Sequence, residues 1–535
     1  MGKLYYNGKI ITMAEAPHTQ RVEAVYVSDG YIRKVGSLES VLKDIPKNTK
    51  RIDLKGRCLM PSFIDAHSHI VMNGQMSQAA DLSECGSFEE IVEKLKEYIE
   101  DQNITSEHVV VGFGYDHNFL KEQRHPDKFA LDQASESIPI MITHISGHLC
   151  CVNSALLKLA GVDENTKDPA GGFIGRLEDA AAPSGYLEEG AMALVQRHVQ
   201  ERFRVSAASI QENMQDIYIQ NGITTVQDGA TTEGDLALLS QMSKDGRLKV
   251  DVVCYPLAAA NGACLMEKYR EFDNRYFGKL KIGGYKIILD GSPQGKSAWL
   301  SKPYEGESQY RGYPYYEDAD VEQYVMQAIQ EGRQILAHCN GDAASEQFLN
   351  AYEKSLDKAS DAPDLRPVMI HCQTVRKDQL ARMAKINMIA SIFIGHVWYW
   401  GDVHMKNLGF DRGGNISPVK DAISSGVKYN FHQDTPVTKP NMLHSVWCAV
   451  NRISRSGNVI GENQKIDVYE ALKAVTINAA YEYFEEKEKG SLEPGKKADM
   501  VILSDSPLEV DVERIKDIRV METIKEGETI FKLES

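Results

Sequence analysis

Residues 59–69 of the chain read Leu59-Met60-Pro61-Ser62-Phe63-Ile64-Asp65-Ala66-His67-Ser68-His69. The apolar residues and the proline predict a buried strand that ends in two histidines. Side chains alternate between the faces of a strand, so His67 and His69 should point to the same side. Two neutral imidazoles there form half of a metal site. An isolated His-x-His pair fits local hydrogen bonding equally well, so the rest of the chain decides.

The composition is that of a large globular protein. The chain has 535 residues, of which 42% are hydrophobic and 25% charged, and its length predicts two to four units or a large α/β barrel with additions. The net charge of -16 disfavours binding to nucleic acid or to an anionic membrane, because both need basic patches. The sequence has no apolar stretch of membrane-spanning length, and its first residues lack an apolar h-region, so we expect no signal peptide. Nine cysteines without a C-x-x-C pair suit a reducing compartment, so we expect a cytoplasmic protein.

Both ends of the chain read as short strands with turns. Strand-like runs flank Ser28-Asp29-Gly30 near the N-terminus and Glu526-Gly527 near the C-terminus, which is typical of hairpins. Each terminal piece is too small to bury a core alone. We therefore predict one β-sandwich domain built from residues 1–60 and 488–535, and a central domain over residues 61–487.

Strand-like and helix-like runs alternate in the central domain, which predicts an α/β fold with a parallel sheet. The candidate strands cover residues 60–67, 222–228, 250–255, 284–290, 334–338, 367–371, 388–392 and 428–434. Eight strands of this kind close a (β/α)8 barrel of the TIM type. The long gap after the first strand predicts an inserted subdomain at about 75–220.

Active sites of such barrels lie at the carboxyl ends of the strands. Further strands end in groups that bind metals or carry protons, namely Lys286, Asp290, His338, His371 and Asp434. Each has a simpler explanation alone, because a strand-end histidine is often hydrogen-bonded locally and a strand-end aspartate often caps the next helix. Their coincidence on strands one, four, five, six and eight favours a metal-dependent active site.

At this point the sequence resembles the amidohydrolase superfamily, in particular the branch of amidohydrolase family 3 that contains N-substituted formamide deformylases. The resemblance covers nearly the whole chain. It rests on residues 61–69, 112–116, 147–153, 171–174, 223–228, 286–292, 338–343, 371–373, 474–480 and 490–499. These motifs are specific for the family and only weakly specific for the substrate. The sequence departs from the branch at His432-Gln433, where a small residue usually precedes the aspartate, and this bears on the local pocket.

The resemblance implies a divalent metal centre of one or two ions. The implied ligands are His67, His69, Lys286, His338, His371 and Asp434. Lys286 would bridge two ions as a carboxylated lysine, since an ammonium group has no lone pair for a metal. Asp434 would touch a metal and act as general base. The expected metal is Zn²⁺, although the same ligand types also suit iron or manganese.

Other residues are candidates for catalysis or substrate contact outside the metal ligands. His148 is the leading candidate for a catalytic donor to an oxyanion, because Ser146-Gly147-His148 could reach the barrel mouth from the insertion. A structural hydrogen bond within the insertion explains His148 equally well. The predicted substrate-binding residues are Asp116, Asp290, His396, Trp398 and His404. The aromatic run over 396–404 suggests a substrate with an apolar or ring part, with core packing as the alternative.

These features predict a metal-dependent hydrolase that cleaves a non-peptide carbon–nitrogen bond of a small amide, using a metal-activated water with Asp434 as general base. Ester or lactone hydrolysis, isomerisation or lyase chemistry on the same site stays open. A catalytically silent regulatory or binding protein is a further alternative, against which the joint presence of all six ligands argues. We expect no nucleic-acid or membrane partner, and the resemblance allows a homodimer.

Overall fold

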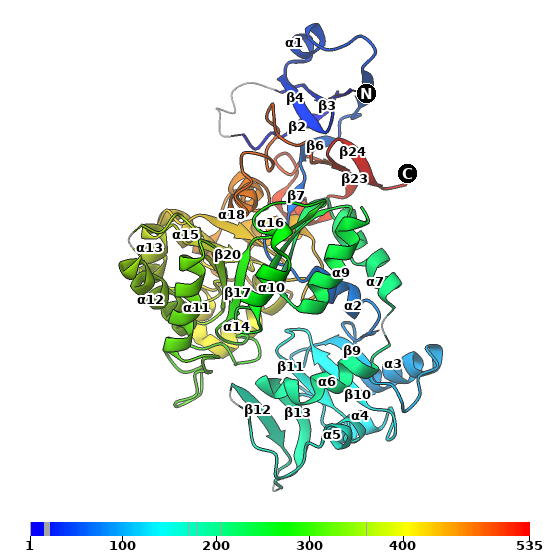
Figure 1. Ribbon diagram of the computed structural model, residues 1–535, viewed down its shortest axis with the longest axis vertical. Coiled ribbons are helices and arrows are strands. Elements are labelled where there is room, and N and C mark those ends of the chain that lie inside the picture. The colour runs from blue at the N-terminus through cyan, green and yellow to red at the C-terminus, as the bar shows by residue number, and fades with distance from the viewer. Residues whose placement is uncertain are drawn as a thin grey trace.

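The computed structural model describes residues 2–14, 22–169, 171–178, 180–204, 206–359 and 361–534. It is a mixed α/β structure with three parts along its long axis (Figure 1). Strands from both chain ends lie together at one end, next to N and C in the view. The α/β part occupies the middle, and the strands of residues 80–189 lie at the opposite end.

The middle part contains two parallel sheets, with strand orders β16-β15-β14-β7 and β17-β18-β19-β20-β21. The strands are β7 (Phe63–Ile64), β14 (Ile223–Thr231), β15 (Asp251–Pro256), β16 (Leu280–Ile282), β17 (Gly284–Ile288), β18 (Gln334–Cys339), β19 (Val368–His371), β20 (Ile389–Ile392) and β21 (Tyr429–Phe431). Each predicted strand region overlaps one of them. The first region is split, because its start forms β6 (Cys58–Pro61) of a terminal sheet.

The two parallel sheets meet at both pairs of edges. β16 runs into β17 through Gly283 and Gly284, so one extended segment pairs first with β15 and then with β18. A side chain at Gly284 would approach the carbonyl oxygen of Gln334 to 2.0 Å, so this contact requires glycine. At the other edges, the backbone N–H of Asp434 donates to the carbonyl of His67 at 3.2 Å. Within the described residues, no continuous ladder closes the two sheets into one.

Helices follow most of these strands and cover the outside. They are α9 (Glu233–Lys244), α10 (Gly262–Lys268), α11 (Asp318–Gln330), α12 (Asp342–Lys358), α13 (Lys377–Lys385), α14 (His396–Gly413), α15 (Val419–Ser424), α16 (Met442–Asn451), α17 (Val468–Ala474) and α18 (Ile477–Glu482). A capping box between Thr232 and Asp235 starts α9. In α12, Phe348, Leu349 and Tyr352 join the main apolar core. Among the described helices, none has the length and apolarity needed to cross a bilayer.

The segment after β7 contains a six-stranded sheet of order β12-β13-β11-β10-β9-β8. Its elements are β8 (Ala80–Asp81), α3 (Phe88–Asp101), β9 (Val110–Tyr115), α4 (Lys128–Asp132), β10 (Ile140–His144), β11 (Leu149–Val152), α5 (Ser154–Ala160), β12 (Gly172–Arg176), β13 (Pro183–Glu189) and α6 (Ala193–Arg202). Neighbouring β9 and β10 are parallel, so their carboxyl ends share an edge. Residues from this sheet form two apolar clusters of their own. We call this segment the insertion.

The terminal strands form two further sheets, of order β4-β3-β1-β5 and β2-β6-β22-β23-β24. The remaining bounds are β1 (Lys3–Tyr6), β2 (Lys9–Ile10), β3 (Ala24–Ser28), β4 (Tyr31–Gly36), β5 (Lys50–Asp53), β22 (Met500–Leu503), β23 (Val520–Lys525) and β24 (Glu528–Lys532). β6 pairs with β22, so the second sheet joins both chain ends. Tyr5, Leu59 and Met500 share one apolar cluster. The exact domain limits at residues 61 and 488 stay a prediction.

Buried charges connect the terminal strands to the middle part. Lys489 and Lys525 each place Nζ 2.6 Å from the same Oδ2 of Asp251. Lys525 also lies 2.7 Å from Asp499, and each of these four residues is at most 4% exposed. Burial alone would raise the pKa of Asp251, but the two ammonium groups hold that pKa well below its usual range. We call these four residues the Asp251 network.

Candidate active site

The six predicted ligands meet at the carboxyl ends of the central strands. His67 and His69 follow β7, Lys286 lies in β17, His338 and His371 lie in β18 and β19, and Asp434 follows β21. Lys286 Nζ is 3.3 Å from His67 Nε2. The ring centroids of His338 and His371 are 4.4 Å apart, and those of His67 and His371 are 5.5 Å apart. The structure therefore brings all six together, while their roles stay predictions.

Hydrogen bonds fix the protons of His67 and His69. His67 Nδ1 lies 2.6 Å from Gln227 Oε1, and Gln227 Nε2 donates to the Ala66 carbonyl, which fixes the orientation of that amide. His69 Nδ1 donates to the carbonyl of Gly229. In the neutral rings, both Nε2 atoms therefore carry lone pairs. Burial lowers the pKa of His67 well below its ordinary value, which keeps that ring neutral.

These lone pairs face a carboxylate oxygen. Asp434 Oδ1 lies 3.4 Å from His67 Nε2 and 3.2 Å from His69 Nε2. It is buried, with no hydrogen-bond partner in the described part of the chain. Three possible metal donors therefore converge here, with Lys286 Nζ as a further neighbour 3.3 Å from His67 Nε2. A divalent cation among them would offset the repulsion between the carboxylate oxygen and the ring lone pairs. The separations also match the edge of a zinc tetrahedron, about 3.3 Å for bonds of about 2.05 Å.

Backbone strain marks the same place. Asp434 has φ of 56° and His371 has φ of 77°, in the left-handed region that residues other than glycine rarely adopt. Both follow or end a central strand, where the chain must turn sharply while its side chain still faces the cluster. The sequence carries no glycine or asparagine at either position to signal this conformation.

Lys286 lies on the buried side of the cluster and is 2% exposed. Burial lowers the pKa of its ammonium group to about 8. A neutral amine is therefore accessible near neutral pH, and only the neutral amine has the lone pair that attacks CO2 to form a carbamate. This fits the predicted carboxylation without testing it.

Sequence reasoning missed two residues that orient these ligands. His432 Nε2 lies 3.1 Å from His371 Nδ1, and its Nδ1 lies 2.9 Å from Ser391 Oγ. Gln227 binds His67, as described above. The signal for His432 was present, because alternation along residues 428–434 puts it on the same face as Asp434. His432 thus lies directly against one of the predicted ligands.

His148 reaches the cluster from the insertion. Its ring centroid is 4.9 Å from that of His338, and its Nδ1 lies 3.0 Å from Glu189 Oε2. Burial disfavours the charged ring, but Glu189 outweighs it and raises the pKa of His148 above its ordinary value. The two explanations of His148 are therefore compatible, since it has a hydrogen bond within the insertion and also borders the predicted ligands.

The predicted substrate-binding residues occupy four different surroundings. Asp290 is fully buried and accepts backbone N–H groups of Trp299, Asn340 and Gly341 at 2.7–3.0 Å, so its oxygens hold loops in place. Asp116 Oδ2 accepts the indole N–H of Trp400 at 2.7 Å, which ties the insertion to α14.

Within residues 396–404, the two histidines and Trp398 contact different parts of the molecule. His396 Nδ1 and His404 Nε2 are 3.1 Å apart and both rings are buried. Trp398 faces elsewhere, with its ring 5.2 Å from that of His444 and 4.6 Å from the guanidinium carbon of Arg455. These surroundings are those of packing and of the contact between α14 and its neighbours. Direct substrate contact by these residues stays a prediction.

A second group with metal-binding residue types lies in the insertion. Asp116, His117 and His144 follow or end the parallel strands β9 and β10. The N–H of Ser146 donates to His144 Nδ1 at 3.1 Å, so the neutral ring carries its proton on Nε2. His144 Nε2 lies 3.2 Å from His117 Nδ1 and 3.4 Å from Asp116 Oδ1, so its proton can be shared between these two acceptors. One shared proton accounts for this group, and we assign no metal to it.

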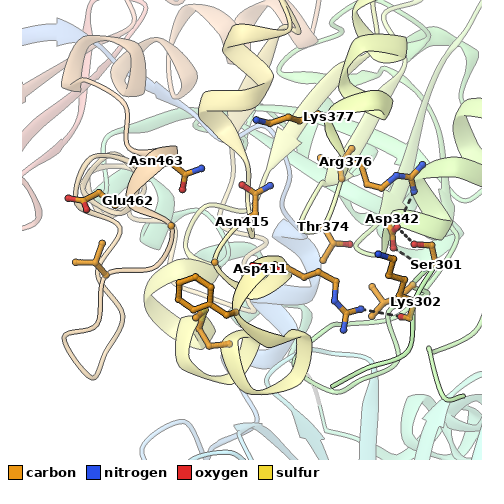
Figure 2. A pocket seen from close by; sticks show the side chains of 18 residues that line it. Ser301, Lys302, Asp342, Thr374, Arg376, Lys377, Asp411, Asn415, Glu462 and Asn463 are labelled. Carbon is orange, nitrogen blue, oxygen red and sulfur yellow. Dashed lines mark hydrogen bonds and ion pairs between the residues drawn. The ribbon is translucent and has the colours of Figure 1, made fainter. Parts of the chain in front are cut away.

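A cavity of about 1010 Å³ lies apart from the cluster, between loops that follow β17, β18, β19 and β20. Figure 2 shows Asp342 on its wall, bound by Ser301 and by Arg376, whose Nη1 is 3.0 Å away. Within the described part of the chain, its lining includes no predicted site residue. Because none of the six clustered side chains lines it, we assign the chemistry to the buried cluster and not to this cavity.

The chain is similar to known proteins over nearly its whole length. A family model described as "Amidohydrolase family" matches residues 50–531. The chain is 28% identical to "Putative amidohydrolase YtcJ" of Bacillus subtilis over 99% of this chain and 100% of that protein. It is 24% identical to "N-substituted formamide deformylase" of Arthrobacter pascens, over 94% of each chain. An uncharacterized metal-dependent hydrolase from Pyrococcus horikoshii shares the fold, with a TM-score of 0.75, 24% identity and coverage of 96% and 99%.

Proposed function

The chain belongs to the amidohydrolase family, and we propose that it is a metal-dependent hydrolase of a non-peptide carbon–nitrogen bond in a small amide. The convergence of His67 Nε2 and His69 Nε2 on Asp434 Oδ1, at 3.4 and 3.2 Å, carries this proposal. The relative named as an N-substituted formamide deformylase supports an amide substrate. The fold neighbour described as a metal-dependent hydrolase supports the metal.

The donor set fits a divalent ion such as Zn²⁺. His67, His69 and Asp434 would hold it, with carboxylated Lys286 shared with a second ion on His338 and His371. When bound, such an ion lowers the pKa of a water molecule to about 7 and polarises the substrate carbonyl. Gln227 and Gly229 hold the two histidine rings with Nε2 toward the ion, because they accept the Nδ1 protons.

In the proposed reaction, Asp434 transfers the proton and His148 donates a hydrogen bond. Asp434 takes one proton from the attacking water, and the new C–O bond gives a tetrahedral intermediate. His148 donates a hydrogen bond to its oxyanion from the insertion side. Asp434 returns the proton to the leaving nitrogen as the C–N bond breaks, so the products are a carboxylic acid and an amine. Proton transfer of this kind contributes about 10²–10⁴-fold to the rate.

The proposal extends to the fold, the location and the substrate class of the protein. We propose that the two parallel sheets are parts of one (β/α)8 barrel, supported by the β16–β17 continuity and the hydrogen bonds at the opposite edges. We propose a cytoplasmic protein, in keeping with nine free cysteines among the described residues. The substrate would be a small molecule with an apolar or aromatic part. The homodimer stays a prediction.

A metal assay combined with a substrate panel tests the proposed function. We expect purified protein to contain at least one divalent ion per chain, and we expect a chelator to abolish hydrolysis until Zn²⁺ is restored. The panel pairs N-substituted formamides and acetamides with esters of matched acyl and leaving groups, plus lactones. Turnover of esters alone would favour the ester alternative. Metal-loaded protein that turns over no member of the panel would favour a silent scaffold.

Substitution of Lys286 tests the bridging role separately. We expect Lys286→Ala to lose at least one equivalent of metal, because the carbamate oxygens are lost with the amine, and short carboxylic acids should partly restore binding. Carbon-13 NMR after incubation with labelled bicarbonate should show a carbamate signal in the wild type only. Lys279→Ala is the control, as Lys279 pairs with Glu526 outside the cluster. A bare amine in metal-replete protein would contradict bridging and favour one ion.

A further inference from the structure

Glu189 ends β13 in the insertion and touches two parts of the molecule at once. Its Oε2 lies 3.0 Å from His148 Nδ1, and its Oε1 accepts the hydroxyl of Ser297 at 3.1 Å. Ser297 belongs to the long loop that follows β17, the strand that carries Lys286. The Glu189 carboxylate therefore lies between the insertion and the loop beside the predicted ligands.

The backbone conformation of Glu189 and the space beside Gly291 both accommodate this carboxylate. Its backbone has φ of 49°, a left-handed conformation that costs about 1–3 kcal/mol in a residue other than glycine. A side chain on Gly291 would approach Glu189 Oε1 to 2.1 Å, so the absence of a Cβ there makes room for the carboxylate. Glu189 is only 7% exposed. A buried, strained carboxylate with both oxygens hydrogen-bonded is a costly arrangement for a residue that only fills space.

The bond to Glu189 decides which nitrogen of His148 faces outward. With Nδ1–H donated to the carboxylate, Nε2 is the ring nitrogen left free, and in the described part of the chain no residue hydrogen-bonds to it. The ring itself packs at 4.9 Å from His338. A carboxylate on Nδ1 holds an imidazole in one orientation. Nε2 is then the ring atom in position for the proposed oxyanion contact.

We propose that Glu189 is a positioning residue, which acts through His148 by holding the ring with Nε2 toward the substrate. This rests on the proposed hydrolytic function and deepens it. The competing explanation is that Glu189 only fastens the insertion to the loop after β17, through its hydrogen bond with Ser297. The two differ in one respect: a positioning residue loses its effect when His148 is absent, whereas a fastening residue does not.

A double-mutant cycle separates these explanations. We expect Glu189→Gln, which keeps the shape but removes the charge, to lower kcat by about 10²–10³-fold with KM nearly unchanged. His148→Gln should cost at least as much, and the double variant should be no worse than His148→Gln alone. Glu122→Gln is the control, since Glu122 is a glutamate of the insertion that accepts the backbone N–H of Phe88 and not His148. Losses that multiply in the double variant would overturn the proposal, as would unchanged kcat in Glu189→Gln.

Nitrogen-15 NMR of histidine-labelled, metal-loaded protein gives a readout that needs no substrate. The His148 signals are identified by their absence in His148→Gln. We expect Glu189→Gln to shift the Nδ1 and Nε2 resonances of His148, and Glu122→Gln to leave them in place. Unchanged His148 resonances in Glu189→Gln would overturn the positioning role even if the enzyme is active. Conversely, a shift without any hydrolysis of the panel would keep this inference on ring orientation and remove the proposed function.

Discussion

We expect Asp434→Asn to lower kcat by about 10²–10⁴-fold on any amide that the wild type hydrolyses. The asparagine oxygen can still face His67 Nε2 and His69 Nε2, which lie 3.4 and 3.2 Å from the carboxylate. It cannot accept a proton, so transfer from water to the leaving nitrogen is lost. Because the substrate is bound mainly by other groups, KM should change much less than kcat.

The measurement pairs steady-state kinetics with metal analysis of the same samples. If Asp434→Asn loses metal, the main role of Asp434 is to bind the ion and not to transfer the proton. Added Zn²⁺ should then restore part of the rate. Asp402→Asn is the control, because Asp402 accepts a hydrogen bond from Asn458 away from the cluster. A metal-replete Asp434→Asn variant within about tenfold of the wild-type rate would contradict the general-base role.

We expect Asp251→Asn to lower the free energy of unfolding by about 3–5 kcal/mol. The substitution leaves Lys489 and Lys525, both buried, without the carboxylate that each contacts at 2.6 Å. Each lysine keeps one other carboxylate, Glu485 at 2.8 Å from Lys489 and Asp499 at 2.7 Å from Lys525. The loss should therefore lie at the low end of this range. Urea unfolding followed by circular dichroism measures the loss. Asp216→Asn is the control, since its pair with Lys249 is about half exposed and should contribute no more than about 1 kcal/mol.

The sign of the pH dependence follows from the direction of the Asp251 pKa. The lysines hold this pKa below its unfolded value, so the stabilisation is complete above the unfolded pKa of about 4 and is lost only as the pH falls further. The stability difference between wild type and Asp251→Asn should therefore stay constant from about pH 5 to 8. A difference that shrinks across that interval would contradict the network as described.

The strand pattern of the central part could be predicted because each strand is a short apolar run that ends in a polar side chain. Carboxyl ends of parallel strands meet, so His67, Lys286, His338, His371 and Asp434 could be expected to gather. The division of residues 280–288 into β16 and β17 could not, because it depends on how closely Gly284 approaches the carbonyl of Gln334. That approach is a property of the packed sheets and not of a local pattern.

The supporting residues of the site were harder to predict than the ligands. His432 shares a strand face with Asp434, so alternation alone would have placed it. Glu189 gives no such signal, because it is 41 positions from His148 and its side chain is aimed by a backbone conformation that the sequence does not announce. His396 and His404 were grouped with Trp398 by their spacing, but the helix turns them to different neighbours.

The tether of both histidine rings to β14, through Gln227 and Gly229, has a consequence for ion uptake. An incoming ion meets donor atoms that are already aimed, so little freedom is lost when it settles. Uptake should then be limited by desolvation of the ion and not by rearrangement of the polypeptide. Discrimination between ions would depend on ionic radius and on preferred bond directions, since rigidly held ligands cannot rearrange around an ion of different size or geometry.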